Sequence, residues 1–384
     1  MESNTGKVIN LSSLYASFAS LQDKRKPKGK RYALATVLLG IFLAKLCGED
    51  KPSGIAEWVK LRGKWLVQLL ELKRESMPHH NTYRRVLADA IDEQEFVRLV
   101  WQRHRYQGQT GYQVVAAIDG KVIRGTIDGE AETGLVLLAI FLPGEGITLA
   151  QVALPSHQNE ISAAPSLLNS VDLRNKVVIG DAMHTQRQVS LQIGTAGGHY
   201  LWTVKANQPQ LLQDLHDWFD SDVTLIPGMG CPAKDFRSAI VTNKAHGRVE
   251  VRTLTASSQL NDFLDWPFLQ QVFRLERKTT VQKSGQTRCQ VVYGITSLPA
   301  EQASPEKLLQ MLRSYWYIEN GLHYRRDVSL REDHTRFKKL CAAHNMAIIN
   351  NLVLALITQA NAGFVPAARR FFAAYPQIAL QLLL

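Results

Sequence analysis

The chain has 384 residues, and 45 Lys and Arg against 34 Asp and Glu give a formal net charge of +11. Its apolar content of 45% is sufficient for packed cores and excludes an intrinsically disordered chain. The length predicts roughly two to three domains. The basic surplus favours a polyanionic partner such as nucleic acid.

Four cysteines lie far apart in the sequence, with no pair at the spacing of a zinc knuckle or a redox motif: Cys47, Cys231, Cys289 and Cys341. This distribution indicates a reducing compartment without structural disulfides. The longest apolar stretch, residues 33–46, contains Lys45 and is shorter than the ~20 residues that cross a bilayer. It predicts a buried helix, no membrane contact and, since it begins too far from Met1 for a signal peptide, a cytoplasmic protein.

Glycine-rich phosphate loops, dinucleotide fingerprints and the nucleophile elbow of serine hydrolases are all absent from the sequence. We therefore expect no nucleotide cofactor.

Residues 1–108 predict a helical N-terminal domain, because apolar residues recur at helical spacing in 34–46 and 58–72. A basic arm precedes these helices and places six cations in eight residues: Lys24, Arg25, Lys26, Lys28, Lys30 and Arg31. The arm is either a solvated segment or one that contacts DNA phosphates. Thr82–Arg85 has two interpretations as well, a DNA contact or an ordinary helix start with exposed arginines.

The pattern changes near residue 112, where short apolar runs predict strands at 114–118, 135–142 and 147–154, the last two joined by a turn at 143–146. Helices are expected at 160–171 and 185–193, and strands at 176–180 and 200–204. This alternation predicts an α/β domain with a partly parallel sheet.

Residues 209–300 interrupt the alternation with β-branched segments at 248–254, 272–275 and 290–295, which predict a β-rich insertion. Ser304-Pro305 marks the start of a helix that continues past Leu322, followed by further helices. We therefore expect four parts: 1–108, 109–208, 209–300 and 301–384.

Asp119 and Asp181 each follow a short apolar run, so each is expected at the end of a buried strand, where carboxylates converge on one cleft. A turn-forming role explains either aspartate taken alone. Glu319 continues a helical stripe and is expected to face the sheet, where a carboxylate needs a cation or a metal. The alternatives are a pair with His323, or a salt bridge to Arg313 or Arg326. Three oxygen ligands favour Mg²⁺ or Mn²⁺ over zinc.

Several motifs together resemble bacterial insertion-sequence DDE transposases, in the subgroup that includes the H-repeat-associated proteins. They occur in the family order across nearly the whole chain: Pro78–Thr82, Ala117–Lys121 with Arg124-Gly125, Gly180–Gln186, Lys205–Gln208, His246–Glu250, Trp316–Tyr324, Asp327-Val328 and Glu332-Asp333. The sequence departs from the related pattern at three positions: Tyr315 stands in place of Arg, Arg326 in place of Lys, and Tyr324 in place of Trp.

The resemblance implies a ribonuclease-H-like mixed-sheet core that is interrupted by the β-rich insertion and preceded by the helical domain. It implies that Asp119, Asp181 and Glu319 form the DDE triad and hold Mg²⁺ or Mn²⁺, with two ions expected. Cations near the triad are candidates for holding phosphates, together with the basic arm: Lys121, Arg124, His184, Lys205, Arg313, His323 and Arg326.

The expected function is that of a DNA transposase that cleaves at the ends of an insertion sequence and joins them to target DNA, as a homodimer in the synaptic complex and associated with the nucleoid when bound to DNA. Two alternatives remain at this point. One is a stand-alone ribonuclease-H-like nuclease, and the other is a domesticated DNA-binding protein that has lost catalysis.

Overall fold

The computed structural model describes residues 14–103, 114–127, 134–154, 158–220, 234–245, 247–334, 336–337 and 339–384, so Cys231 and His246 lie outside the described residues. The chain forms two compact units. Unit 1 comprises Met1–Gln109, Gly120–Asn159 and Ile318–Leu384, and unit 2 comprises Thr110–Asp119 and Glu160–Tyr317. This division does not test the expected four parts, which remain a prediction.

The described strands form a nine-stranded mixed sheet in the order β3-β2-β1-β4-β5-β9-β8-β7-β6. Their bounds are β1 Val114–Ile123, β2 Leu135–Leu142, β3 Ile147–Leu154, β4 Lys176–Gly180, β5 His199–Val204, β6 Arg237–Ala245, β7 Arg248–Ser257, β8 Gln271–Val281 and β9 Thr287–Thr296. Strand β4 pairs in parallel with both β1 and β5, whereas β5–β9 and the pairs among β6–β9 are antiparallel. The expected α/β class with a partly parallel sheet is confirmed.

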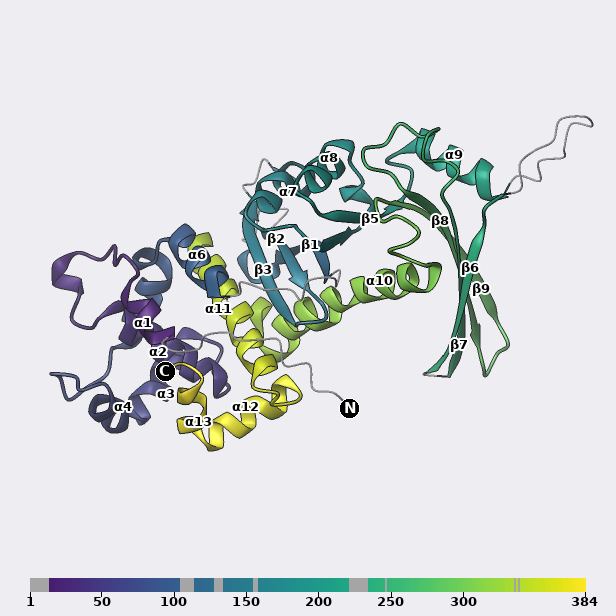
Figure 1. Cartoon of the computed structure of the whole chain (residues 1–384). Helices are drawn as coiled ribbons and strands as arrows, with labels where there is room; N and C mark the ends of the chain where they lie inside the picture. Colours follow the sequence, from purple (N-terminus) through teal and green to yellow (C-terminus); the bar gives the residue numbers. More distant parts are fainter. Residues whose placement is uncertain are drawn as a thin grey trace, which may run out of the picture. The chain divides into compact units, whose positions relative to one another are not determined.

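Unit 2 covers its sheet with helices on both faces (Figure 1). The helices are α7 Glu160–Asn169, α8 Arg187–Thr195, α9 Pro209–Asp220 and α10 Pro305–Ile318. On one face, Leu201 of β5 belongs to a buried cluster with Leu308 of α10. On the other face, the next residue, Trp202, donates its indole N–H to Ser190 Oγ of α8 at 3.0 Å. The alternation of side chains along β5 therefore places apolar groups on both faces, as a fully covered strand requires.

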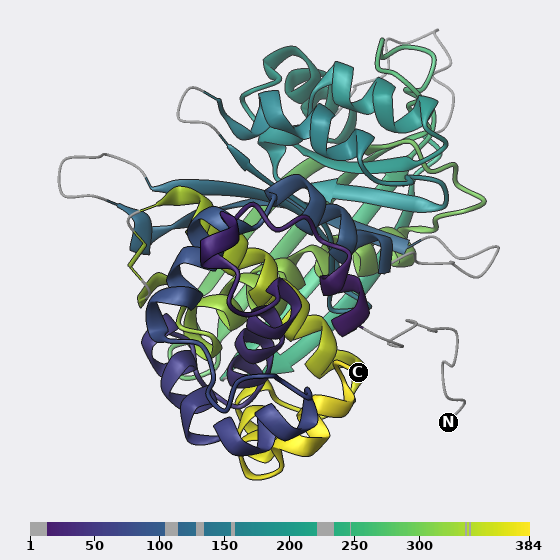
Figure 2. The same cartoon turned by 90° about the vertical axis from the view of Figure 1, so that its left-hand side faces the viewer.

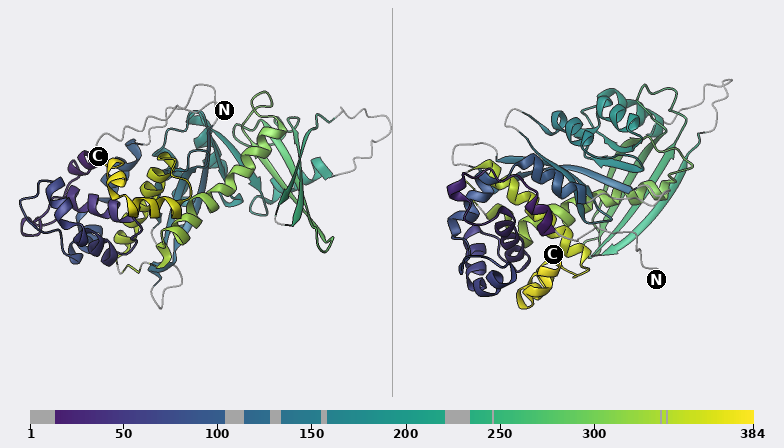
Figure 3. Two further views of the ribbon diagram at one scale, coloured as in Figure 1. Left: turned by 90° about the horizontal axis from the view of Figure 1, so that it is seen from below. Right: turned by 60° about the vertical axis from the view of Figure 1, so that its left-hand side comes forward.

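The four strands between residues 209 and 300 continue the same sheet rather than forming a sheet of their own (Figure 3). The connection is the antiparallel pairing of β9 with β5, from Leu201 with Thr296 to Val204 with Tyr293. Gly294 permits this contact, because a Cβ atom there would lie 2.4 Å from the Trp202 carbonyl oxygen and 2.1 Å from the Phe273 ring.

In unit 1, helices from both ends of the chain share one core (Figure 2). They are α1 Leu14–Ala19, α2 Leu34–Leu46, α3 Pro52–Leu61, α4 Gly63–Leu69, α5 His80–Arg85, α6 Glu93–Arg103, α11 Leu340–Gln359, α12 Val365–Ala374 and α13 Pro376–Gln381. Every residue of α2 is buried, which confirms the buried helix expected from the sequence. Helix α11 is long and apolar enough to cross a membrane, but 89% of that window is buried inside the protein, as in a core helix.

Candidate active site

Asp119 and Asp181 lie next to each other in unit 2. The parallel register of β1 and β4 ends with Ile118 opposite Gly180. Asp119 directly follows Ile118, and Asp181 directly follows Gly180. Neighbouring strands are about 4.8 Å apart, which places the two carboxylates side by side. Asp119 was expected at the end of its strand, and this is wrong because β1 continues to Ile123. The strand continues because β2 still flanks β1 in the sheet after β4 has ended.

Gly180 brings β4 close to its neighbours immediately before Asp181. A Cβ atom at this position would lie 2.8 Å from Ile118 Cγ2 and 3.0 Å from His184 Cδ2. The His184 ring is fully buried, with Nε2 3.5 Å from a carboxylate oxygen of Glu160. The expectation that His184 holds phosphate is therefore wrong, because the ring fills the space against Gly180 and has no access to solvent.

The Asp181 carboxylate is held by two donors. Its Oδ1 accepts hydrogen bonds from the Ala182 backbone N–H at 2.7 Å and from Lys205 Nζ at 2.9 Å. Burial by itself raises the pKa of Asp181, but these hydrogen bonds and the charge of Lys205 outweigh it and lower the pKa below its usual value. Both side chains remain accessible, with 49% of Asp181 and 60% of Lys205 exposed, so an ionised carboxylate is available to a ligand.

The turn after Asp181 is fixed by side chains to which the sequence analysis gave no role. Asn207 donates to the Ala182 carbonyl at 2.7 Å, and Gln208 donates to the Thr185 carbonyl at 2.9 Å. The Thr185 hydroxyl donates to the Thr203 carbonyl at 2.7 Å. The signal that could have identified them was their occurrence in two motifs, Asn207 and Gln208 in Lys205–Gln208 and Thr185 in Gly180–Gln186. They are positioning residues for Asp181.

Glu319 was expected to face inward, and this is wrong, because 58% of its side chain is exposed. The buried face of this helix runs through Met311 and Ile318 to Leu322 rather than through Glu319. Glu319 itself begins a π-helical turn, Glu319–His323, in which the Tyr324 N–H donates to the Glu319 carbonyl. An exposed carboxylate is accessible to a metal ion and to substrate.

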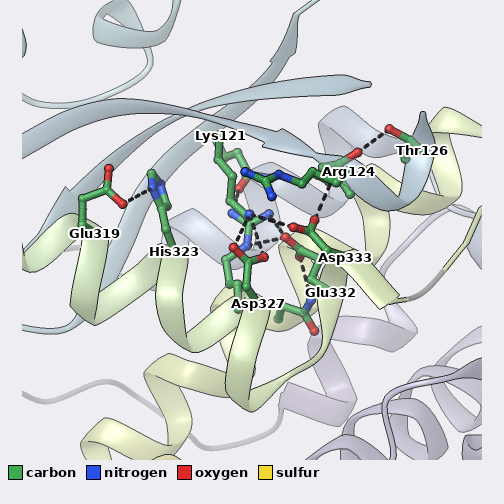
Figure 4. A network of polar contacts seen from close by, with 12 residues as sticks. Lys121, Arg124, Thr126, Glu319, His323, Asp327, Glu332 and Asp333 are labelled. Carbon is green, nitrogen blue, oxygen red and sulfur yellow. Dashed lines mark hydrogen bonds and ion pairs between the residues drawn. The ribbon is translucent and has the colours of Figure 1, made fainter. Parts of the chain in front are cut away.

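His323 lies beside Glu319, with its Nδ1 3.7 Å from a carboxylate oxygen, which is one of the alternatives anticipated for this glutamate (Figure 4). Burial, together with the charges of Arg326 and Lys121, lowers the pKa of His323 to about 3. The imidazole is therefore neutral at pH 7. A neutral, buried ring does not supply the positive charge expected of a phosphate-holding residue.

Two further cations expected to hold phosphates, Lys121 and Arg326, are buried in unit 1, and Figure 4 shows Lys121 among the acids that surround it. Lys121 Nζ lies 2.7 Å from Asp327 and 3.9 Å from Asp333, and only 7% of its side chain is exposed. The Arg326 guanidinium is fully buried, with a nitrogen 2.7 Å from Glu332. Both expectations are wrong, since each cation is itself buried and paired with acids.

Three of the cations expected to hold phosphates have exposed side chains: Arg124, Lys205 and Arg313. In the basic arm, Arg25 is bound to Asp23 and to the Tyr32 carbonyl and is only 8% exposed, so its expected phosphate contact is also wrong. Lys24 pairs with Asp92 at 2.6 Å but stays 47% exposed. The remaining cations of the arm are exposed: Lys26, Lys28, Lys30 and Arg31.

The available donors fit a hard divalent cation. Asp119 and Asp181 offer carboxylate oxygens from adjacent strands of unit 2, and Glu319 offers an accessible carboxylate in unit 1. Oxygen donors of this kind are the ligands of Mg²⁺ and Mn²⁺. The described cysteines, Cys47, Cys289 and Cys341, are free thiols.

Comparisons with known proteins agree with this geometry. The family described as "Transposase DDE domain" matches residues 111–356, and "DDE_Tnp_1-associated" matches residues 15–102. The "H repeat-associated putative transposase YhhI" of Escherichia coli K12 is 26% identical over 359 residues, which cover 91% of each chain. An uncharacterised protein in the dhlA 3′ region of Xanthobacter autotrophicus is 30% identical over 285 residues, 72% of this chain and 92% of that protein.

Among solved structures, a piggyBac transposase synaptic complex with hairpin DNA aligns with 98% of this chain and 79% of that chain. The identity is 10% and the TM-score is 0.45, which is too low a similarity to support an inference.

Proposed function

Because the chain belongs to the family of transposases with a DDE domain, we propose that it binds the terminal repeats of an insertion sequence, hydrolyses a phosphodiester bond at each end and joins the freed 3′-hydroxyl to target DNA. The observation that carries this proposal is the adjacency of Asp119 and Asp181 on parallel strands. The charge of +11 supports double-stranded DNA as the partner, since phosphate contacts supply sequence-independent affinity.

Asp119, Asp181 and Glu319 are the proposed ligands of one or two Mg²⁺ or Mn²⁺ ions. Such ions, when bound between carboxylates, activate the attacking oxygen and stabilise the leaving oxygen of a phosphoryl transfer. The residues of the chain prepare the ligands for this role. Lys205 keeps Asp181 ionised, and Asn207 and Gln208 fix the turn that carries it. The neutral His323 lies 3.7 Å from the Glu319 carboxylate.

The cellular context belongs to the same proposal. Joining two ends of an element requires both ends in one assembly, so we propose a homodimer in the synaptic complex. Action on chromosomal DNA places the protein in the cytoplasm, at the nucleoid. A stand-alone nuclease would cleave without joining ends, and a domesticated binding protein would bind without cleaving.

The test is Asp181→Asn in a nicking assay on DNA that carries the element's ends, with Mg²⁺ or Mn²⁺. Loss of a ligand charge is expected to lower cleavage by about a thousandfold or more, equivalent to about 4 kcal/mol of transition-state stabilisation, while end binding stays nearly unchanged. The matched control is Asp172→Asn, an exposed aspartate of the same unit that is paired with Arg174. Cleavage by Asp181→Asn at the wild-type rate would refute the triad assignment.

A further inference from the structure

Unit 1 contains a pocket of about 800 Å³ that is unrelated to the proposed triad. Its walls come from the start of α3, from α5 with the turn after it, and from the segment that leads into α11. The lining is dominated by cationic and histidine side chains: Lys51, His80, Arg84, Arg85, His334, Arg336 and Lys339. Residues from opposite ends of the chain thus build one basic concavity.

The positive charge of this pocket is largely uncompensated. Asp89 is the acid among its lining residues, and it is already paired with Lys339. Within the described parts of the chain, Lys51, Arg84, Arg85 and Arg336 form no ion pair, and all four are exposed. This differs from Arg326, whose charge is neutralised internally. Like charges gathered in a concave wall repel one another, and a bound anion relieves that repulsion.

The wall that carries Arg84 and Arg85 is rigid. Tyr83 between them and the N-terminus of α5 is fully buried, and the helix continues into the π-helical turn Val86–Ala90. Two residues of α11 secure that turn. Asn345 donates to the Leu87 carbonyl at 2.9 Å, and the Cys341 thiol lies 3.0 Å from the Ala88 carbonyl.

The opposite wall is anchored in the same way. Phe337, next to Arg336, packs against a buried cluster that includes Ala343 and Ala347 of α11. Helix α11 therefore supports both walls, and the two sets of cations are held in place before any ligand arrives. A pre-organised site loses less side-chain entropy on binding than a flexible arm does.

We propose that this basic pocket binds the phosphodiester backbone of duplex DNA. Arginine guanidinium groups bind phosphate oxygens in a bidentate manner, and four unpaired cations across a pocket of this size match several successive phosphates rather than a single small anion. Four lining residues have apolar side chains, Pro52, Ala88, Phe337 and Ala342, but seven have cationic or histidine side chains, so the charge of the pocket favours an anion. The identity of the ligand, double-stranded DNA, rests on the proposed function. The inference adds the surface of the protein to which this DNA binds.

The test compares two triple variants of the full chain. The first, Arg84→Gln with Arg85→Gln and Arg336→Gln, removes three cations from the pocket. The matched control, Lys60→Gln with Lys64→Gln and Lys73→Gln, removes three exposed cations of unit 1 from outside the pocket. Fluorescence anisotropy with a labelled duplex, recorded over a KCl series without divalent ions, gives the affinity and its salt dependence.

We expect the pocket variant to lose about a hundredfold in affinity near 0.1 M salt and about two to three units of the logarithmic salt slope, since each phosphate contact contributes about 0.9 unit. The control is expected to change affinity by less than about threefold, and both variants should unfold at the wild-type temperature. Equal losses in the two variants, or no loss in the pocket variant, would overturn the proposal. A competition experiment with single-stranded RNA adds a further check. If the RNA displaces the duplex from the wild type and the pocket variant no longer binds the RNA, the pocket recognises single-stranded RNA and the proposal is overturned.

The outcome is separable from that of the proposed function. Nicking is measured at saturating protein for the wild type, the pocket variant and Asp181→Asn. If the pocket variant binds DNA normally while Asp181→Asn loses cleavage, the pocket assignment fails and the transposase function stands. If the pocket variant loses binding while the wild type never cleaves DNA, the function fails and the pocket stands.

Discussion

Two acid–cation pairs show how differently the same residue types are used in the two units. In unit 2, Asp181 and Lys205 form a contact of 2.9 Å with 49% and 60% of their side chains exposed. In unit 1, Glu332 and Arg326 form a contact of 2.7 Å with 2% and 0% exposed. The distances are similar, so contact geometry alone does not distinguish a pair that exchanges partners from one that is permanent.

Burial makes the distinction. An exposed pair is screened by water and contributes little to stability, so Asp181 can exchange Lys205 for another cation at small cost. A buried pair has lost its hydration, and removing either member leaves an uncompensated charge in the interior. The first pair suits a site for chemistry, and the second suits a structural role. Five predictions test this comparison.

The largest expected effect is on the buried pair. Arg326→Met leaves Glu332 without its cation and is expected to lower the free energy of unfolding by about 3–5 kcal/mol. Adding Glu332→Leu to this variant removes the stranded charge and is expected to restore much of the loss. Urea denaturation followed by circular dichroism measures both variants. A single variant as stable as the wild type would show that the pair is not structural.

The next effect concerns the support of Asp181. Asn207→Ala removes the hydrogen bond to the Ala182 carbonyl and is expected to lower cleavage by about 10–100-fold, as for other residues that orient metal ligands, with DNA affinity unchanged. Gln210→Ala is the matched control, because the exposed Gln210 side chain donates to Asp214 of the same helix, α9. Nicking and binding assays decide it, and equal activity of the two variants would exclude a positioning role.

A smaller effect is expected for the exposed pair itself. Lys205→Ala is expected to lower cleavage by about tenfold, a loss that diminishes as salt increases, while stability changes by less than about 1 kcal/mol. Arg187→Ala, which breaks another exposed pair of unit 2 with Asp265, should leave cleavage unchanged. If Lys205→Ala lowers stability and cleavage in parallel, the pair of Lys205 with Asp181 has a structural role.

The smallest effect tests a second buried cluster of unit 1, in which Lys45 and Arg369 share the single acid Asp50, at 3.1 and 2.7 Å. Lys45→Met leaves one cation for one acid and is expected to stabilise unit 1 by about 1 kcal/mol, whereas the exposed Lys60→Met should have no effect. Urea denaturation of both variants provides the measurement. Destabilisation by Lys45→Met would show that Asp50 needs both cations.

The pH dependence of this cluster has a defined sign. Burial lowers the pKa of Lys45 below its ordinary 10.5, against the opposing charge of Asp50. Between the folded-state pKa and 10.5, the unfolded chain binds a proton that the folded chain lacks, so the stability of the wild type rises with pH in that window. The difference in the free energy of unfolding between Lys45→Met and the wild type should therefore become smaller as pH approaches 10.5. A stability difference that becomes larger with pH would contradict a lowered pKa of Lys45.

The sequence by itself determined most of the local structure and the proposed chemistry. Strands β2, β3 and β4 begin and end at the residues that the apolar runs predicted, because a short buried run in a covered sheet is set by local hydrophobicity. The motifs around Asp119 and Asp181 predicted neighbouring strands, and the register confirms that the two residues are adjacent.

Only the tertiary structure decided which charged residues are buried. The spacing predicted that Glu319 faces inward, but the buried face of the helix runs through Ile318, and Glu319 is exposed. Arg326 and Arg84 each stand beside a second arginine in the sequence. Arg326 is nevertheless buried and paired with Glu332, whereas Arg84 lines a basic pocket with Arg336. Periodicity reports the local face of one helix or strand, whereas burial also depends on segments far away in the sequence. Gln151, which accepts a hydrogen bond from the buried Arg326 guanidinium, lies 175 residues away from it.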